Sequence, residues 1–353
     1  MKLIRGFLMS EKLRTSRVFY SGFLLVLLAA LLYLFKDYLM TMSIGILLAI
    51  STLSIQKFSL KISKNSQILA TTITIIALFG LFCLPLFYLI FSVFKYLSNL
   101  DMNSINESIN HIRSYSIALL DKFGFLKPKI SEFLATFDLN AMVSNSLKYL
   151  SSSLSGGVNF AVDMSFIMIF IFFTHYYGAY LSSYVAAVAP IATKEIKEIF
   201  NEVSNTMSVV FYSTIVNMVL QGVLFALIVG LYGYDWALFG VLFAFASLIP
   251  IVGGALVFVP LCIYELSVSG WINAIIIAIY TIVVISTLAD NFIKPLIIKF
   301  ISRKLIGDET RINELLIFFS MMAGLSSFGF WGIVLGPAIL TLFIASFRVY
   351  VKR

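Results

Sequence analysis

Residues 315–347 read LLIFFSMMAGLSSFGFWGIVLGPAILTLFIASF and contain no charged side chain. This run of 33 residues is too long for one helical crossing, because about 20 residues span the hydrocarbon core of a bilayer. Its centre, Gly324–Gly332, reads GLSSFGFWG, and glycine weakens a helix. We therefore predict a re-entrant helical hairpin, which enters the membrane and returns to the same side.

A second uncharged stretch, Trp236–Tyr264, has the same character. Its centre is Ile249-Pro250-Ile251-Val252-Gly253-Gly254, where proline and glycine disfavour a continuous helix. Broken backbone at membrane depth is tolerated only where protein or a water-filled cavity covers it. We expect the tip glycines, Gly253 and Gly332, to be required for close backbone approach and for a permissive φ.

The composition of the whole chain indicates a membrane protein. The chain has 353 residues, is 60% hydrophobic and 12% charged, and contains 34 phenylalanines, whereas soluble domains carry about 25% charged residues. A water-soluble globule has too much surface for so many apolar side chains. The fold class predicted is an all-α polytopic membrane protein with about eight hydrophobic segments, two re-entrant hairpins among them, and a helical extramembrane insert.

The hydrophobic segments divide the chain into three parts: a basic N-terminal segment with three spans (1–94), an amphipathic extracytoplasmic insert (95–157) and a transport core (158–353). In the insert, the last amphipathic stretch is expected to end at Gly156-Gly157. The eight segments are Val18–Phe35, Tyr38–Ile55, Ser66–Phe94 (interrupted by Pro85), Val158–Leu181, Met207–Leu231, Trp236–Tyr264, Leu266–Ala289 and Leu315–Phe347.

Lysine and arginine favour one orientation of these segments. With both hairpins returning to their own side, 18 Lys and Arg residues face the cytoplasm and seven face outside, as the positive-inside rule requires. This predicts a multi-pass protein of the bacterial inner membrane with cytoplasmic termini. The net charge of +8 is explained by these loops, so no nucleic-acid partner is expected.

The sequence carries no motif of a soluble enzyme. No Gly is followed by Lys, and neither G-x-G nor G-x-S-x-G occurs, so phosphate-loop, Rossmann and hydrolase sites are not expected. The histidines, His111 and His175, fall in different compartments and predict no metal pair. His175 is explained by an interfacial aromatic belt with Tyr176, and a role in proton transfer is the alternative. Cys83 and Cys262 lie in apolar runs, which predicts free thiols.

Polar residues inside the spans are the informative set, because each is costly in a membrane unless it meets water, a partner or an ion. Thr214, Asn217 and Gln221 follow at i, i+3 and i+7 and predict a polar stripe on the fifth span. Polar residues of the seventh span are expected to share one face, with Asp290 at its inner end and Pro295 interrupting the helix: Asn273, Tyr280, Thr287 and Asn291. The alternatives are interhelical hydrogen bonds for the stripe and an ion pair of Asp290 with Lys294.

Three blocks resemble the autoinducer-2 exporter family of bacterial membrane transporters. They are IPIVGGALVFVP (Ile249–Pro260), DNFIKP (Asp290–Pro295) and GLSSFGFWGIVLGP (Gly324–Pro337). The resemblance implies a permease for small solutes; export of signalling molecules and sodium/proton antiport are both attributed to members. The chain departs from the family pattern at Lys299, where members often carry Gly, and at Asn313-Glu314, where they often carry Pro.

We therefore expect a gradient-coupled secondary transporter with no cofactor other than Na⁺ or H⁺ as coupling ion. Its expected partners are membrane lipid, a small solute or ion, and further copies of the chain. The alternatives are a passive channel or facilitator, and a membrane scaffold that binds an envelope partner through residues 95–157. The transport and hinge candidates are Pro250, Gly253, Gly254, Asp290, Asn291, Pro295, Gly329, Gly332, Gly336 and Pro337, and the lining candidates are Thr214, Asn217, Gln221, Tyr280 and Thr287.

Overall fold

The computed structural model describes residues 19–98, 139–188, 193–250, 252–306 and 314–351. Every regular element in these ranges is a helix, which confirms the all-α prediction. The basic segment 1–17 and residues 99–138 of the insert lie outside the described residues.

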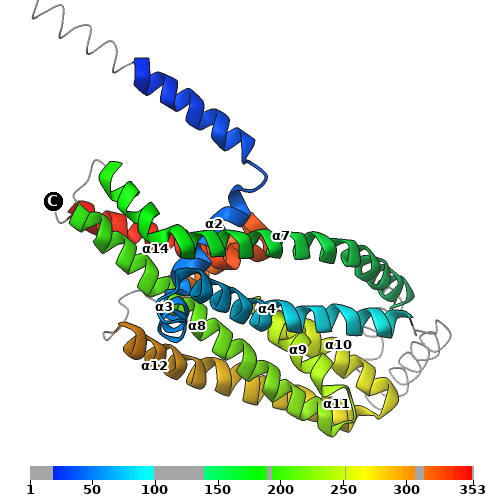
Figure 1. Ribbon diagram of the computed structural model, residues 1–353. Helices are drawn as coiled ribbons and strands as arrows, with labels where there is room; N and C mark the ends of the chain where they lie inside the picture. The colour runs from blue at the N-terminus through cyan, green and yellow to red at the C-terminus, as the bar shows by residue number, and fades with distance from the viewer. Residues whose placement is uncertain (1–18, 99–138, 189–192, 251, 307–313, 352–353) are drawn as a thin grey trace, which may run out of the picture.

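The helices follow one another through short connections (Figure 1). A first helix covers Phe19–Leu34. The others are α2 (Leu39–Ser51), α3 (Leu53–Ile62), α4 (Gln67–Ser98), α7 (Leu139–Val188), α8 (Thr193–Leu231), α9 (Trp236–Ala246), α10 (Gly253–Val268), α11 (Trp271–Tyr280), the π-helix η1 (Thr281–Ile293), α12 (Lys294–Ile306), α13 (Glu314–Phe328), the short 3₁₀-helix η2 (Gly329–Trp331) and α14 (Gly332–Val351).

Five described stretches are long and apolar enough to cross a membrane: Gln67–Lys95, Phe160–Tyr184, Thr193–Leu231, Trp271–Lys304 and Leu315–Val351. A sixth candidate is a bent pair, in which the helix Phe19–Leu34 meets α2 at 92°. The first helix projects away from the bundle in Figure 1 with its side chains exposed. The fold class is thus confirmed, and the number of eight separate membrane segments stays a prediction.

The last apolar stretch folds back on itself at η2, so that α13 and α14 form a helical hairpin. A Cβ atom added to Gly336 would lie 1.9 Å from the carbonyl oxygen of Ser320, and one added to Gly332 would lie 1.8 Å from that of Gly324. The two backbones therefore touch along the hairpin, and any side chain at these positions would separate them.

The helices α9 and α10 form the second hairpin, closed by residues 247–252. A Cβ atom on Gly253 would lie 1.8 Å from the carbonyl oxygen of Ala246. Close approach therefore explains Gly253 and Gly332, but the permissive φ expected there is wrong: Gly332 has a φ of −64°, and Gly253 is not among the residues with positive φ. The left-handed residue of the α13–α14 tip is Gly329, with a φ of 62°. The re-entrant placement of both hairpins in a membrane stays a prediction.

Three expected helix breaks are absent. The helix α7 continues through Gly156-Gly157, because a cost of about 1 kcal/mol per glycine is small in so long a helix. The helix α4 continues through Pro85. Pro295 does not interrupt its helix either, since helical backbone runs through it from Trp271 to Lys304. The missing N–H of this proline follows directly on the π-helical turns of η1, where the hydrogen-bond pattern is already shifted.

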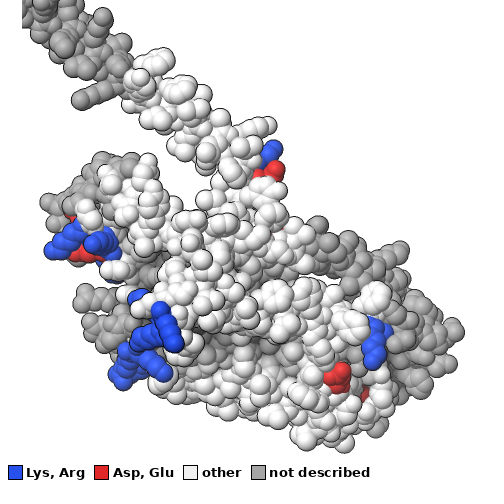
Figure 2. Space-filling model, viewed as in Figure 1, with Lys and Arg blue, Asp and Glu red and all other residues white. Residues whose placement is uncertain are grey.

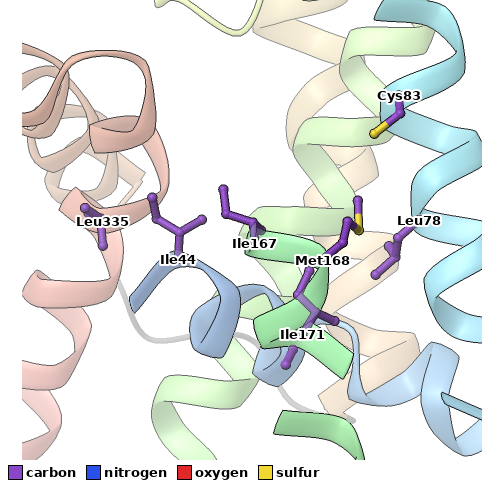
Figure 3. Packing of buried hydrophobic residues seen from close by; sticks show 8 residues of the cluster. Ile44, Leu78, Cys83, Ile167, Met168, Ile171 and Leu335 are labelled. Atoms are coloured by element: carbon purple, nitrogen blue, oxygen red, sulfur yellow. The ribbon is translucent and has the colours of Figure 1, made fainter. Parts of the chain in front are cut away.

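The core forms where α2, α4, α7 and α14 meet. Figure 3 shows Ile44 of α2, Leu78 of α4, Ile167 of α7 and Leu335 of α14 directed toward one another, and each is buried. A second cluster joins α8 and α9, where Phe225 and Phe243 stack with ring centroids 4.3 Å apart. The helix α8 passes both clusters, because its residues pack on α2, α9 and α14.

Charge is distributed unevenly along the bundle. Lys and Arg side chains gather mainly at the left-hand end in Figure 2, where Figure 1 places α3, α12 and the end of α14. The last turns of these three helices carry Lys61, Arg303 with Lys304, and Arg348. Arg348 also pairs with Glu202 of α8 at 2.5 Å. The turns that join α8 to α9 and α10 to α11 lie at the opposite end.

Candidate functional site

A cavity of about 100 Å³ lies between the tips of the two hairpins. Phe245 and Leu248, where α9 ends, line it on one side, and Phe330 and Trp331 of the α13–α14 tip line it on the other. The base of the α9–α10 hairpin and the base of the α13–α14 hairpin lie at opposite ends of the bundle (Figure 1). The cavity is therefore the place where structures entering from the two ends meet.

Aromatic rings close the cavity on the side of the α13–α14 tip. Trp331 stacks on Phe160 of α7 with ring centroids 5.1 Å apart and planes at 3°. Phe330 meets the same ring edge-on at 5.8 Å. The positive φ of Gly329 gives the chain the turn that presents these two rings, since left-handed backbone favours glycine.

Polar groups reach the cavity at one edge. Ser51 and Thr52 line it from α2, and Thr214 lines it from α8. Thr52 stands between α2 and α3 with non-helical backbone (φ −98°, ψ 13°). A broken helix beside a cavity is a common feature of transporter binding sites.

His175 of α7 lies behind this edge and is 5% exposed. The Thr52 hydroxyl donates to the Leu48 carbonyl at 2.7 Å and lies 3.1 Å from His175 Nε2. Because a hydroxyl has one proton to donate, we assign the proton of the neutral ring to Nε2, which donates to Thr52. Nδ1 is then a buried acceptor without a partner among the described residues. The interfacial belt expected for His175 is wrong, because the ring is enclosed by protein.

A buried hydrogen-bond network continues from there between α3 and α4. Gln56 donates to Thr71 at 3.0 Å and accepts from Thr74 at 2.8 Å, and Thr74 also donates to Ser59 at 3.1 Å. Sequence reasoning missed these residues. The available signal was the spacing of Thr71 and Thr74 on one face of an otherwise apolar span, opposite a glutamine in the preceding segment.

The predicted polar stripe of α8 leads away from the cavity. Thr214 lines the cavity, Asn217 is buried with no partner for Oδ1 among the described residues, and Gln221 donates to Asp290 Oδ1 at 2.7 Å. The spacing i, i+3, i+7 places the three on one face of the helix. The structure thus brings Asp290 to the stripe, and among the described residues it forms no ion pair with Lys294.

The predicted shared face of the seventh span is wrong beyond Tyr280. The Tyr280 hydroxyl donates to the Leu224 carbonyl of α8 at 3.1 Å. Thr287 and Asn291 instead donate to carbonyls five residues earlier and are exposed. The π-helix η1 causes this, because its wider turn changes the spacing of residues on one face. The buried positions in this region are Ile277, Thr281, Ile285 and Ala289.

The proline and glycine candidates act mainly through packing. A Cβ on Gly254 would lie 3.0 Å from the Phe243 ring. Pro337 follows Gly336 in α14, is buried, and its carbonyl accepts from Thr341 at 2.7 Å. Pro250 lies in the turn between α9 and α10.

A buried carboxylate, Glu265 of α10, was missed. It is 3% exposed, Tyr234 donates to its Oε2, and Asn273 donates to its Oε1 at 3.1 Å. The available signal was its isolation: it is the one charged residue between Asp235 and Asp290. Its two donors tie together the turns at the base of the α9–α10 hairpin. Within the described ranges, no group of three or more His, Cys, Asp or Glu residues could hold a metal ion.

Comparison with known proteins gives consistent matches. The sequence model of the AI-2E family transporters matches residues 23–352. Two proteins of Helicobacter pylori, from strains J99 and 26695, are each 32% identical over 91% of this chain and 91% of their own length. A protein of Aquifex aeolicus is 32% identical over 46% of this chain and 44% of its own length. All three carry the name "Putative transport protein".

Proposed function

Because the chain belongs to the AI-2E family of transporters, we propose that it is a gradient-coupled secondary transporter that moves a small solute through the cavity between the hairpin tips. The observation that carries the proposal is the shared cavity: Leu248 from one hairpin and Trp331 from the other line the same space. Movement of either hairpin would open that space toward one end of the bundle. Broken helical elements that meet near the middle are the usual basis of alternating access.

We assign the coupling step to Asp290. Its carboxylate is held by an uncharged donor, Gln221, so that no fixed cation neutralises it among the described residues. A carboxylate in this position can bind Na⁺ or exchange a proton. Asn217, with its unpartnered Oδ1, and Thr214 extend polar groups from this carboxylate to the cavity.

We place the protein in the bacterial inner membrane as a multi-pass chain with cytoplasmic termini. The basic last turns of α3, α12 and α14 favour the end of the bundle where they lie as the cytoplasmic one. The exposed apolar side chains of residues 19–34 require lipid or another copy of the chain, and we propose a homo-oligomer. Chemical cross-linking in native membranes tests this, and a cross-linked product of monomer mass alone would contradict it.

The transport proposal is tested with purified protein in liposomes. The vesicles are incubated with a small-molecule extract of bacterial culture under an imposed Na⁺ or H⁺ gradient, and mass spectrometry measures what accumulates inside. Wild-type protein should concentrate at least one solute in a gradient-dependent way that empty vesicles do not show. Equilibration without accumulation would instead identify a passive facilitator, and absence of both would refute transport.

The variant Asp290→Asn should still exchange the solute but lose accumulation, because the side chain keeps its shape and loses its charge. The matched control is Asp235→Asn, which also removes one negative charge. Asp235 caps α9 by accepting from the N–H groups of Ala237 and Leu238, and asparagine caps helices equally well. Full accumulation by a folded Asp290→Asn protein would remove Asp290 from the coupling step.

A further inference from the structure

The lining of the cavity between the hairpin tips is chemically one-sided. None of the residues that line it carries a charge, and most are aliphatic, aromatic or methionine side chains. The hydroxyl groups of Ser51, Thr52 and Thr214 are the polar side-chain groups among them. A solute in this space therefore meets an environment close to that of a protein core.

Such a lining selects against ions. Moving a carboxylate or an ammonium group from water into an apolar surrounding costs several kcal/mol unless an opposite charge meets it, and the cavity supplies none. The nearest ionisable groups described above, His175 and Asp290, are not among the lining residues. An uncharged solute avoids this cost.

The volume limits the size of the solute. An engineered apolar cavity of about 150 Å³ binds benzene, and this cavity measures about 100 Å³. Met164, Met168, Met207 and Met321 all line it, and unbranched thioether side chains adapt readily to the shape of a guest. The space therefore suits a compact molecule with a body about the size of a six-membered ring.

One hydroxyl is available to hold a polar group of that molecule. Ser51 donates to the Leu47 carbonyl at 2.8 Å, and Thr52 is engaged with Leu48 and His175. Thr214 makes no hydrogen bond with any described residue. Because a hydroxyl both donates and accepts, Thr214 can bind a hydroxyl, carbonyl or amide group of the guest.

We propose that the cavity binds an uncharged, mainly apolar small molecule that places one hydrogen-bonding group against Thr214. The identity of this molecule as the transported solute rests on the proposed function, whereas its binding does not. The class of ligand is thus a compact aromatic or aliphatic alcohol, ketone or amide rather than an organic ion or a sugar.

Trp331 provides a direct measure of binding, because it lines the cavity. In a protein carrying Trp236→Phe and Trp271→Phe, Trp331 is the remaining tryptophan of the three in the chain. Bromine quenches tryptophan fluorescence on contact, so 4-bromophenol, bromobenzene and 4-bromobenzoate serve as probes. The matched control is the protein with Trp236 alone, whose side chain is 65% exposed and reports partitioning into detergent or lipid.

We expect saturable quenching of Trp331 by 4-bromophenol and linear, unsaturable quenching of Trp236. The affinity for 4-bromobenzoate should be lower by about 100-fold or more, because its carboxylate must be desolvated. Thr214→Val, which has the same shape, should weaken 4-bromophenol binding by about 2- to 10-fold, as expected for one net hydrogen bond, and leave bromobenzene binding unchanged. Val210→Phe, which fills the cavity from α8, should abolish saturation for all three probes.

Equal affinities for the phenol and the benzoate would overturn the proposal, as would unsaturable quenching of Trp331. Because Thr214→Val removes no packing volume, it keeps the test informative if Val210→Phe fails to fold. Saturable binding in a protein that shows no gradient-driven accumulation would leave this site in place and refute the transport proposal instead.

Discussion

Replacing Gly336 by alanine should push apart the two arms of the α13–α14 hairpin. The added Cβ would lie 1.9 Å from the Ser320 carbonyl oxygen, whereas real Cβ atoms essentially never approach a heavy atom below 3.0 Å. The arms must therefore separate by about 1 Å or more. The contact is with backbone, so no side-chain rotation can relieve it.

The expected cost follows from comparison with a glycine that has room. Overpacking of a close contact costs about 1–3 kcal/mol, and alanine in a helix gains about 1 kcal/mol over glycine. In α7, a Cβ on Gly178 would meet nothing within 4 Å, so Gly178→Ala collects the helical gain alone. The difference between the two variants isolates the contact and should be about 1–3 kcal/mol.

Thermal unfolding of the detergent-purified protein measures this difference. A maleimide dye that fluoresces on reaction reports unfolding through Cys83, which is 4% exposed and becomes reactive when the core opens. Gly336→Ala should melt below wild type and Gly178→Ala at or above it. Gly336→Ala should also shift the emission of Trp331, because the tip that carries this residue moves with the arms. Identical melting and identical emission in both variants would refute the close-packed hairpin.

Three further predictions concern topology and buried polar groups. In a cysteine-free background, Lys304→Cys should be labelled by an impermeant maleimide only after cells are opened, and Ser269→Cys in intact cells; the reverse pattern would refute re-entry of the α9–α10 hairpin. Glu265→Gln should lower stability by about 1–3 kcal/mol, because its new amide N–H₂ faces a neighbouring donor, and unchanged melting would contradict the buried pair of hydrogen bonds. Thr52→Val should cost about 1–3 kcal/mol by leaving the Nε2 proton of His175 without an acceptor, and unchanged melting would contradict the tautomer assigned here.

The parts of the fold that depend on local pattern were predictable. The length of the 315–347 run and its glycines indicated a hairpin, and spacing along one helix placed Thr214, Asn217 and Gln221 on one face. Pairings between distant segments were not: Thr52 and His175 are 123 residues apart, and neither position has a local feature that names the other. The π-helix was also missed, because a shift from i→i+4 to i→i+5 hydrogen bonds has no clear signature in residue type. Without it, Thr287 and Asn291 were assigned to the wrong face.

The continuity of α7 has a consequence for protein engineering. This helix begins at Leu139, within the segment predicted as the insert, and reaches the cavity wall at Ile167 without a break. A chimera that exchanges the insert with that of a relative must therefore be joined inside a helix. Each residue gained or lost at the junction turns the exchanged part by about 100° around the helix axis and moves it by about 1.5 Å. Grafts that preserve residue number between positions 139 and 160 keep the original bearing of the exchanged part, and a deletion of two residues points it the opposite way.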